Sequence, residues 1–216
     1  MIIWIFREER SGSTAFADKV ARHLSREHKF VNMNDFTMVQ AIANPQDYVF
    51  STHSFDFLEI MEYYSDDVLL IRCTRKNKVE HWMSYMLAWR MNKAVNHTKR
   101  FWNIKRDNSL NTEIDTFIEA QSVLITKKEV ALCYEYFCSM KELWDRISIN
   151  YQHVNVYYED LCNPGVNIPL INLSDCKITD QDSYTIKLPD YKQRLCMNYD
   201  MVRKWIENYS AQVVEW

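Results

Sequence analysis

Short runs of apolar residues recur along the chain and alternate with longer segments in which apolar residues return every three or four positions. The first run, at residues 2–6, is apolar throughout, which favours a strand buried on both faces of a parallel sheet. Other runs are rich in β-branched and aromatic residues, as strands are. We predict strands at residues 2–6, 30–33, 48–53, 68–71 and 153–158.

Segments with helical spacing lie between these runs. Phe16, Val20 and Leu24 follow one another at intervals of four and form one face of a predicted helix. Asn77 with Glu80 three positions later resembles a capping box at a helix start. We predict helices at residues 13–28, 55–64, from 77 onward, 114–149 with a break near 126–128, and 199–213, and a loop at 95–110.

The alternation of strands and helices predicts an α/β fold in which helices flank a central parallel β-sheet. A chain of 216 residues with 47% hydrophobic content is long enough for one substantial core, so we expect a single domain over residues 1–216.

The charge balance and the cysteines exclude several classes of protein. A net charge of −3 provides no overall basic field, so we expect no nucleic-acid partner, and an anion must be bound by a local cluster. The first apolar run ends before Arg7, too early for a signal peptide or a membrane span, which favours a cytoplasmic protein. The six cysteines form no C-x-x-C pair and indicate neither a metal site nor a disulfide framework.

The segment after the first strand is the strongest candidate for chemistry. Gly12 is one of only two glycines, and it lies between a predicted strand and a predicted helix, where phosphate loops occur. The segment Arg10-Ser11-Gly12-Ser13-Thr14 offers a cation, two hydroxyl groups and backbone N–H groups to an anion. Simple capping of the helix by Ser13 or Thr14 is the alternative. No lysine follows Gly12, which argues against a nucleoside triphosphatase loop.

This segment resembles the 5′-phosphosulfate loop of the sulfotransferases that use 3′-phosphoadenosine 5′-phosphosulfate (PAPS), in the form of the carbohydrate and trehalose enzymes. Residues 68–85 are similar to the family's 3′-phosphate segment, in which a strand ends in arginine and a serine follows on the next helix. Residues 158–161, Tyr-Glu-Asp-Leu, resemble a late strand end of the family, and Trp205 resembles a residue of its closing helix. The matches follow the family's order from residue 2 to about residue 210.

The resemblance implies the P-loop nucleotide-binding-like fold of sulfotransferases and transfer of a sulfuryl group from PAPS, without a metal, to a hydroxyl or amine. The product nucleotide is 3′-phosphoadenosine 5′-phosphate (PAP), and the acceptor is a small molecule or a carbohydrate. Residues 11–14 would bind the 5′-phosphate, while Arg10 would stabilise charge on the sulfuryl group and the leaving oxygen. The 3′-phosphate would be bound by Arg75 and Ser84, with Arg72 as the neighbouring candidate.

Transfer to an alcohol needs a base, and the resemblance offers two positions. His53 ends Ser51-Thr52-His53, which resembles the Lys-Thr-His motif of cytosolic sulfotransferases with Ser51 in place of lysine. Asp35 precedes Phe36 as the proposed base of the trehalose type does. We rank His53 first because the ordinary pKa of histidine, near 6.5, suits a base at neutral pH. Either residue could instead belong to a turn.

Several features keep other functions open. Glu8 and Glu9 add negative charge beside the predicted anion site, and with Ser51 they allow a catalytically silent member that only binds PAPS or PAP. A nucleotide kinase-like phosphoryl transferase is the second alternative. The neighbouring carboxylates Glu159 and Asp160 are expected to be structural. The acceptor and the oligomeric state are set by features that the sequence does not explain.

Overall fold

The computed structural model describes much of the chain, and its residues group into two compact units. The described residues are 1–8, 11–31, 44–53, 67–94, 122–162, 167, 168, 171, 173 and 191–211. The first unit comprises Met1–Lys76 and Leu143–Asp182, and the second comprises Asn77–Glu142 and Ser183–Trp216. The single domain that we expect over residues 1–216 stays a prediction.

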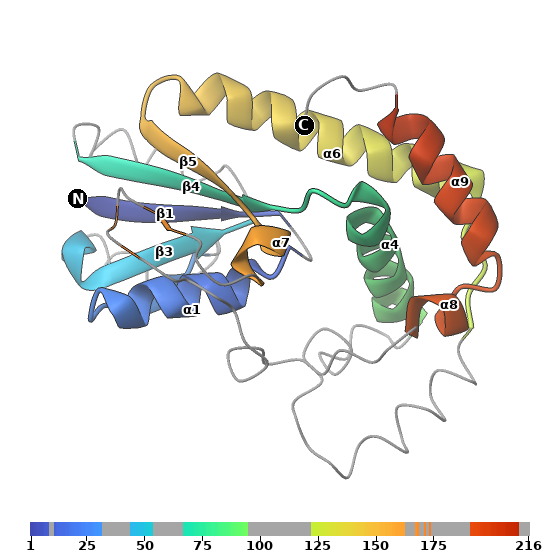
Figure 1. Ribbon diagram of the computed structural model, residues 1–216, viewed down its shortest axis with the longest axis horizontal. Coiled ribbons are helices and arrows are strands. Elements are labelled where there is room, and N and C mark those ends of the chain that lie inside the picture. The colour runs from blue at the N-terminus through green and yellow to red at the C-terminus, as the bar shows by residue number, and fades with distance from the viewer. Residues whose placement is uncertain are drawn as a thin grey trace, which may run out of the picture. The chain divides into compact units, whose positions relative to one another are not determined.

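The first unit is built on a five-stranded, all-parallel sheet in the order β2-β3-β1-β4-β5 (Figure 1). This confirms the α/β architecture with a central parallel sheet. The strands are β1 (Ile2–Arg7), β2 (Glu27–Phe30), β3 (Tyr48–Thr52), β4 (Val68–Thr74) and β5 (Gln152–Tyr157). Strand β1 pairs with β3 and β4 at its two edges, and its residues Ile2–Phe6 are buried, as its apolar run predicts.

Helix α1 (Ser13–His23) covers one face of this sheet (Figure 1). Alternate residues of each strand point to this face, and Ile3 and Ile5 of β1 pack with Phe16 and Val20 of the helix. All four side chains are fully buried. The same alternation directs Arg7, two positions after Ile5, toward the side of the sheet that α1 covers.

The opposite face of the sheet is packed with aromatic rings. Trp4 stacks on Phe50 of β3 with ring centroids 4.7 Å apart. Phe6 stacks at 6.1 Å on Trp144, which lies in the last turns of helix α6 (Lys127–Ser148). Both faces of β1 are therefore closed by apolar side chains, and its carboxyl end leads to the polar residues of the candidate site.

The second unit is helical. It contains α4 (Lys78–Ala94), the first turns of α6, α8 (Tyr191–Leu195) and α9 (Tyr199–Ser210). Its core includes Trp82, which stacks on Phe137 at 6.0 Å. The predicted start of α4 is confirmed, because the N–H of Glu80 donates to Asn77 Oδ1 at 3.0 Å.

The breaks between elements differ in part from the predictions. Helix α1 ends at His23 rather than at residue 28, because Ser25 adopts a positive φ of 53° that a helix cannot contain. The second strand accordingly begins at Glu27, three residues before its predicted start. The long helix begins at Lys127, where the break near 126–128 was predicted. Residues Tyr158–Leu161 form a short helix, α7, and not the end of the last strand.

Several predicted elements lie outside the described residues, namely the helix at 55–64, the loop at 95–110 and the first part of the helix at 114–149. Another short element is the 3-10 turn Pro45–Asp47. Among the described helices, none combines the length and the apolar character that crossing a membrane requires.

Candidate anion-binding site

The carboxyl ends of β1, β3 and β4 lie side by side and carry most of the described polar residues predicted from the sequence. The chain runs from β1 to β2 and β3 on one side of β1, and then crosses to β4 and β5 on the other side. Ligands of open parallel sheets bind at such a switch point, beyond the carboxyl ends of the strands. The residues that follow these three strands therefore define the candidate site.

The loop between β1 and α1 turns back on itself at Ser11. The hydroxyl of Ser11 donates to the carbonyl oxygen of Glu8 at 2.6 Å, and its N–H donates to the same oxygen at 3.2 Å. Gly12 follows as the N-cap of α1, with a left-handed φ of 75° that glycine adopts without strain. Since the cap is a glycine, Ser13 and Thr14 stand in the first helical turn and keep their hydroxyls for other contacts.

Tyr158, the first residue of α7, connects this loop to the end of β4. A β-carbon placed on Gly12 would lie 2.4 Å from Cδ2 of the Tyr158 ring, so only glycine fits between the loop and the ring. The Arg75 guanidinium lies over the same ring, 4.3 Å from its centroid. Gly12 and Arg75, which we predict to serve the two phosphates of one cofactor, thus contact one aromatic side chain.

Arg7 is a functional candidate that the sequence reasoning missed. Its Nε donates to Ser13 Oγ at 3.2 Å, its Nη2 donates to Thr14 Oγ1, and its Nη1 donates to Ser51 Oγ at 3.3 Å. The guanidinium also lies 4.8 Å from the centroid of the Phe30 ring. An apolar strand that ends in a cation, two positions after an inward-facing residue, is the pattern that could have revealed it.

The carboxylate of Glu8 is bound inside the fold and does not face the loop as a bare charge. Arg72 donates to it through Nε at 2.7 Å and through Nη2, and the Thr74 hydroxyl donates to its other oxygen. All three residues are buried. The negative charge of Glu8 beside the predicted anion site is therefore neutralised by Arg72, whose guanidinium is bound to Glu8.

Arg75 and its neighbour Lys76 are held at the end of β4 by residues around α7. The backbone N–H of Lys76 donates to Glu159 at 2.9 Å, and its ammonium group pairs with Asp160 at 2.6 Å. Both carboxylates thus contact Lys76, and the structural role that we expect of them stays a prediction. They lie in a helical turn, however, and not on a strand.

Ser84, the second predicted ligand of the 3′-phosphate, is buried on α4 in the second unit. Arg10, Glu9 and Asp35 lie outside the described residues. The roles assigned to Arg10 and Asp35 therefore stay predictions.

His53 follows β3 and is fixed by a contact with β1. Its Nδ1 lies 2.6 Å from the carbonyl oxygen of Arg7, and since that oxygen can only accept, Nδ1 carries the proton. Burial lowers the pKa of His53 to about 4, and the positive charge of Arg7 acts in the same direction. The ring is therefore neutral at pH 7 with Nε2 as its basic nitrogen. The sequence-based expectation of a pKa near 6.5 did not include this environment.

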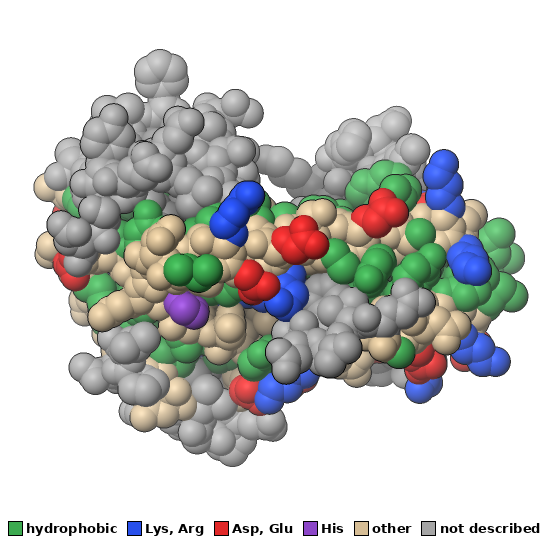
Figure 2. Space-filling model, turned by 90° about the horizontal axis from the view of Figure 1, so that it is seen from above, with side chains coloured by type: hydrophobic (Ala, Val, Ile, Leu, Met, Phe, Trp, Pro, Cys, Tyr) green, Lys and Arg blue, Asp and Glu red, His purple; other side chains and the backbone are tan. Residues whose placement is uncertain are grey.

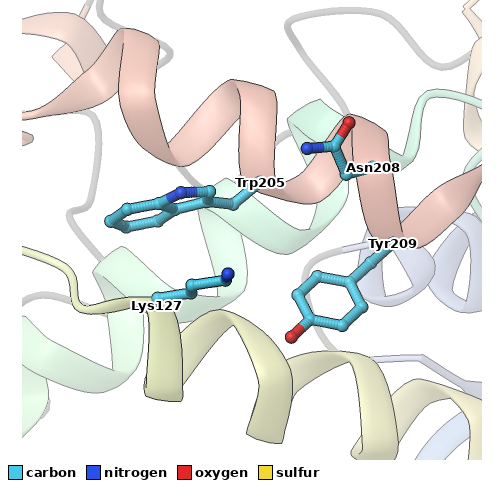
Figure 3. A pocket seen from close by; sticks show the side chains of 4 residues that line it. All are labelled: Lys127, Trp205, Asn208 and Tyr209. Atoms are coloured by element: carbon cyan, nitrogen blue, oxygen red, sulfur yellow. The ribbon is translucent and has the colours of Figure 1, made fainter.

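The second unit carries a separate hollow of about 410 Å³, lined by Lys127, Trp205, Asn208 and Tyr209 (Figure 3). Trp205 and Tyr209 project from α9, and Lys127 stands at the start of α6. Lys127 and Asn208 are exposed, so the hollow offers two rings but no buried polar group. It contains none of the residues predicted to bind the cofactor.

On the face seen in Figure 2, charged side chains of both signs are scattered among the described residues. This agrees with the net charge of −3 and leaves anion binding to local groups such as those around the β1–α1 loop. Within the described residues, no group of three or more His, Cys, Asp or Glu side chains could hold a metal ion.

Comparison of the chain with protein-family models, with curated proteins and with solved structures gives no match.

Proposed function

We propose that the chain is a PAPS-dependent sulfotransferase, which moves a sulfuryl group from the 5′-phosphosulfate of PAPS to a hydroxyl or amine of an acceptor. The observation that carries the proposal is the contact of Gly12 and Arg75 with the same ring of Tyr158. PAPS and PAP carry phosphates on the 3′ and 5′ positions of one ribose, so they need two anion-binding groups held near each other. A nucleoside triphosphate needs one continuous cradle instead.

Each group at the strand ends has a role in this proposal. The N–H groups at the start of α1 and the hydroxyls of Ser13 and Thr14 would bind the 5′-phosphate, whereas the N–H and the hydroxyl of Ser11 both donate to Glu8. Arg75 would bind the 3′-phosphate, and Arg10 would stabilise charge on the leaving oxygen. We prefer Arg75 to Arg72 because Arg72 donates to buried Glu8 and would leave an unpaired carboxylate if it turned to a ligand.

His53 is our first candidate for the base that accepts the proton of the acceptor. Its Nδ1–H is fixed on the Arg7 carbonyl, which leaves Nε2 to accept a proton. Burial and the charge of Arg7, which keep the ring neutral, also make it a weaker base than a free histidine. Asp35 is the alternative.

Two other functions compete with this one. A kinase-like phosphoryl transferase would use the same kind of loop, but the loop lacks the lysine that contacts the terminal phosphates in P-loop enzymes. A catalytically silent member of the family would bind PAP but would not transfer a sulfuryl group. Glu8 was one of the residues that favoured a catalytically inactive protein. Because it pairs with Arg72, its carboxylate does not repel the cofactor as an isolated charge.

A calorimetric titration with PAP in the absence of magnesium tests the proposal, with magnesium-ATP as the comparison. We expect saturable binding of PAP and none of ATP. Absence of PAP binding at millimolar concentration would reject the sulfotransferase, and magnesium-dependent binding of ATP would favour the phosphoryl transferase. Incubation with labelled PAPS and a panel of sugars, lipids, phenols and peptides then separates an active enzyme from a silent one.

A further inference from the structure

Four side chains from four elements form a continuous hydrogen-bonded chain that ends at the loop. His28 of β2 contacts Asp18 of α1 through Nδ1 at 2.5 Å and Ser51 of β3 through Nε2 at 2.7 Å. Ser51 Oγ accepts Nη1–H of Arg7 at 3.3 Å. The chain therefore runs from Asp18 to the guanidinium that donates to Ser13 and Thr14.

The chemistry of the groups fixes the direction of this chain. An ionised carboxylate can only accept, so Nδ1 of His28 donates to Asp18. With Nδ1–H directed at Asp18, Nε2 is placed to accept the hydroxyl proton of Ser51. The lone pairs of Ser51 remain for Arg7, which can only donate. His28 on one side and Arg7 on the other thus hold the Ser51 hydroxyl in one orientation.

An acid, a histidine and a serine in this order also form the triad of serine hydrolases. Burial decides against that function here, because Ser51 is 0% exposed and a nucleophile must reach its substrate. Its oxygen also accepts from Arg7. The chain therefore acts on Arg7 and not on an electrophile.

Arg7 lies beside the two hydroxyls at the start of α1. Its planar fork lies across the first turn of α1, with Nε on Ser13 and Nη2 on Thr14. These are the hydroxyls that would bind the 5′-phosphate, so a bound anion would meet the guanidinium together with them. Without Ser51, the third contact of the fork is lost and the side chain gains rotamer freedom.

We propose that Arg7, at the end of β1, is an anion-binding residue of the candidate site and that Asp18, His28 and Ser51 are its positioning residues. The identity of the anion, the phosphosulfate end of PAPS, rests on the proposed function, but the role of Arg7 does not. Inorganic pyrophosphate carries the same oxyanion chemistry without the nucleoside. The two ligands therefore separate the two claims.

The test is titration of PAP and of pyrophosphate into the full chain and its variants at one salt concentration. Loss of a charge-assisted contact in Arg7→Gln should weaken binding of both ligands by about 10- to 100-fold. Ser51→Ala should weaken both by about 3- to 10-fold, and should have no further effect in the Arg7→Gln background, because Ser51 acts through Arg7. The control Arg22→Gln removes an exposed cation of α1 and should change neither the affinity for PAP nor the affinity for pyrophosphate.

Two measurements exclude a merely structural role. Thermal unfolding shows whether each variant folds, and Arg7→Lys keeps the charge but not the fork if Arg7→Gln is unstable. Long-range ¹H–¹⁵N spectra should show the Nδ1–H tautomer for His28 in the wild type. Asp18→Asn should shift it toward the Nε2–H tautomer and weaken pyrophosphate binding as Ser51→Ala does.

The outcomes are distinguishable. Wild-type affinity of Arg7→Gln for both ligands would overturn the inference and leave the proposed function standing. Additive effects of Arg7→Gln and Ser51→Ala would overturn the positioning role, as would labelling of Ser51 by a fluorophosphonate. If pyrophosphate binds through Arg7 and PAP does not bind, the inference holds and the proposed function fails. If the wild type binds neither ligand, both fail.

Discussion

The ring of Tyr158 occupies the space that a side chain at Gly12 would need, with the nearest ring carbon 2.4 Å from an ideal β-carbon. This contact joins the loop after β1 to α7, the helix that follows β5. Tyr158, the first residue of α7, lies 146 positions after Gly12 in the sequence. Gly12 is therefore required for two reasons, its left-handed φ and the lack of space beside the Tyr158 ring. Mutation can separate the two effects.

Gly12→Ala should lower the free energy of unfolding by about 2–4 kcal/mol, because alanine is strained at a φ of 75° and its β-carbon overlaps the Tyr158 ring. In a Tyr158→Ala background the overlap is gone, and the same change should cost only the backbone part, about 1–2 kcal/mol. Urea unfolding of the four proteins measures both effects. An equal cost in the two backgrounds would show that the ring does not press on the loop.

Glu8→Gln should destabilise the protein by about 3–5 kcal/mol, because it leaves the buried guanidinium of Arg72 without its counter-charge. Asp160→Asn is the matched control, since it breaks the exposed pair with Lys76 and should leave the unfolding midpoint unchanged within error. Urea unfolding measures both variants. A small effect of Glu8→Gln would contradict the buried pair and restore Arg72 as a candidate for the 3′-phosphate.

The sequence predicted those parts of the fold that depend on a continuous apolar pattern. The strand at residues 2–6 and the helix from Ser13 were found because their side chains build the core. The strand Glu27–Phe30 was misplaced because its residues are mostly polar and its stability comes from pairing with β3. The local pattern of apolar and polar residues does not show which strand will pair with this segment.

The candidate site was predictable only to the extent that it is local in the sequence. The loop around Gly12 has a recognisable pattern, and so does the arginine-rich end of β4. The hydrogen bonds of Arg7 and the pairing of Glu8 with Arg72 depend on which strands lie side by side. Neither could be deduced from spacing along the chain, and both change the assignment of the cations.

The depressed pKa of His53 makes stability depend on pH. The folded-state pKa is about 4 and the unfolded value is near 6.5, so between these values the unfolded chain binds the proton and the folded protein does not. Stability contributed by this residue should therefore fall as the pH falls from about 6.5 toward 4, by about 2 kcal/mol at pH 5. Urea unfolding of the wild type and of His53→Gln at pH 7 and pH 5 measures the difference. An equal loss in both proteins would exclude His53 as its source.

Cys73 should resist alkylation in the native protein. Burial raises the pKa of its thiol to about 12, so almost no thiolate is present at neutral pH, and the thiol lies against the carbonyl oxygen of Ser11 at 3.6 Å. Mass spectrometry after treatment with iodoacetamide should find Cys73 unmodified in the native protein and modified in urea. Rapid modification without denaturant would mean that the loop opens readily.

The central claim is that the loop at Gly12 and Arg75 form one site for two phosphates. Its most direct test compares the affinities of PAP and of adenosine 5′-monophosphate, which lacks the 3′-phosphate, in the wild type, Arg75→Gln and the control Lys76→Gln. We predict that the wild type prefers PAP, and that Arg75→Gln loses about 10- to 100-fold in affinity for PAP with little change for the monophosphate, whereas Lys76→Gln retains the preference. A wild type that binds both nucleotides equally, or an Arg75→Gln variant that keeps the preference for PAP, would show that Arg75 does not bind the 3′-phosphate.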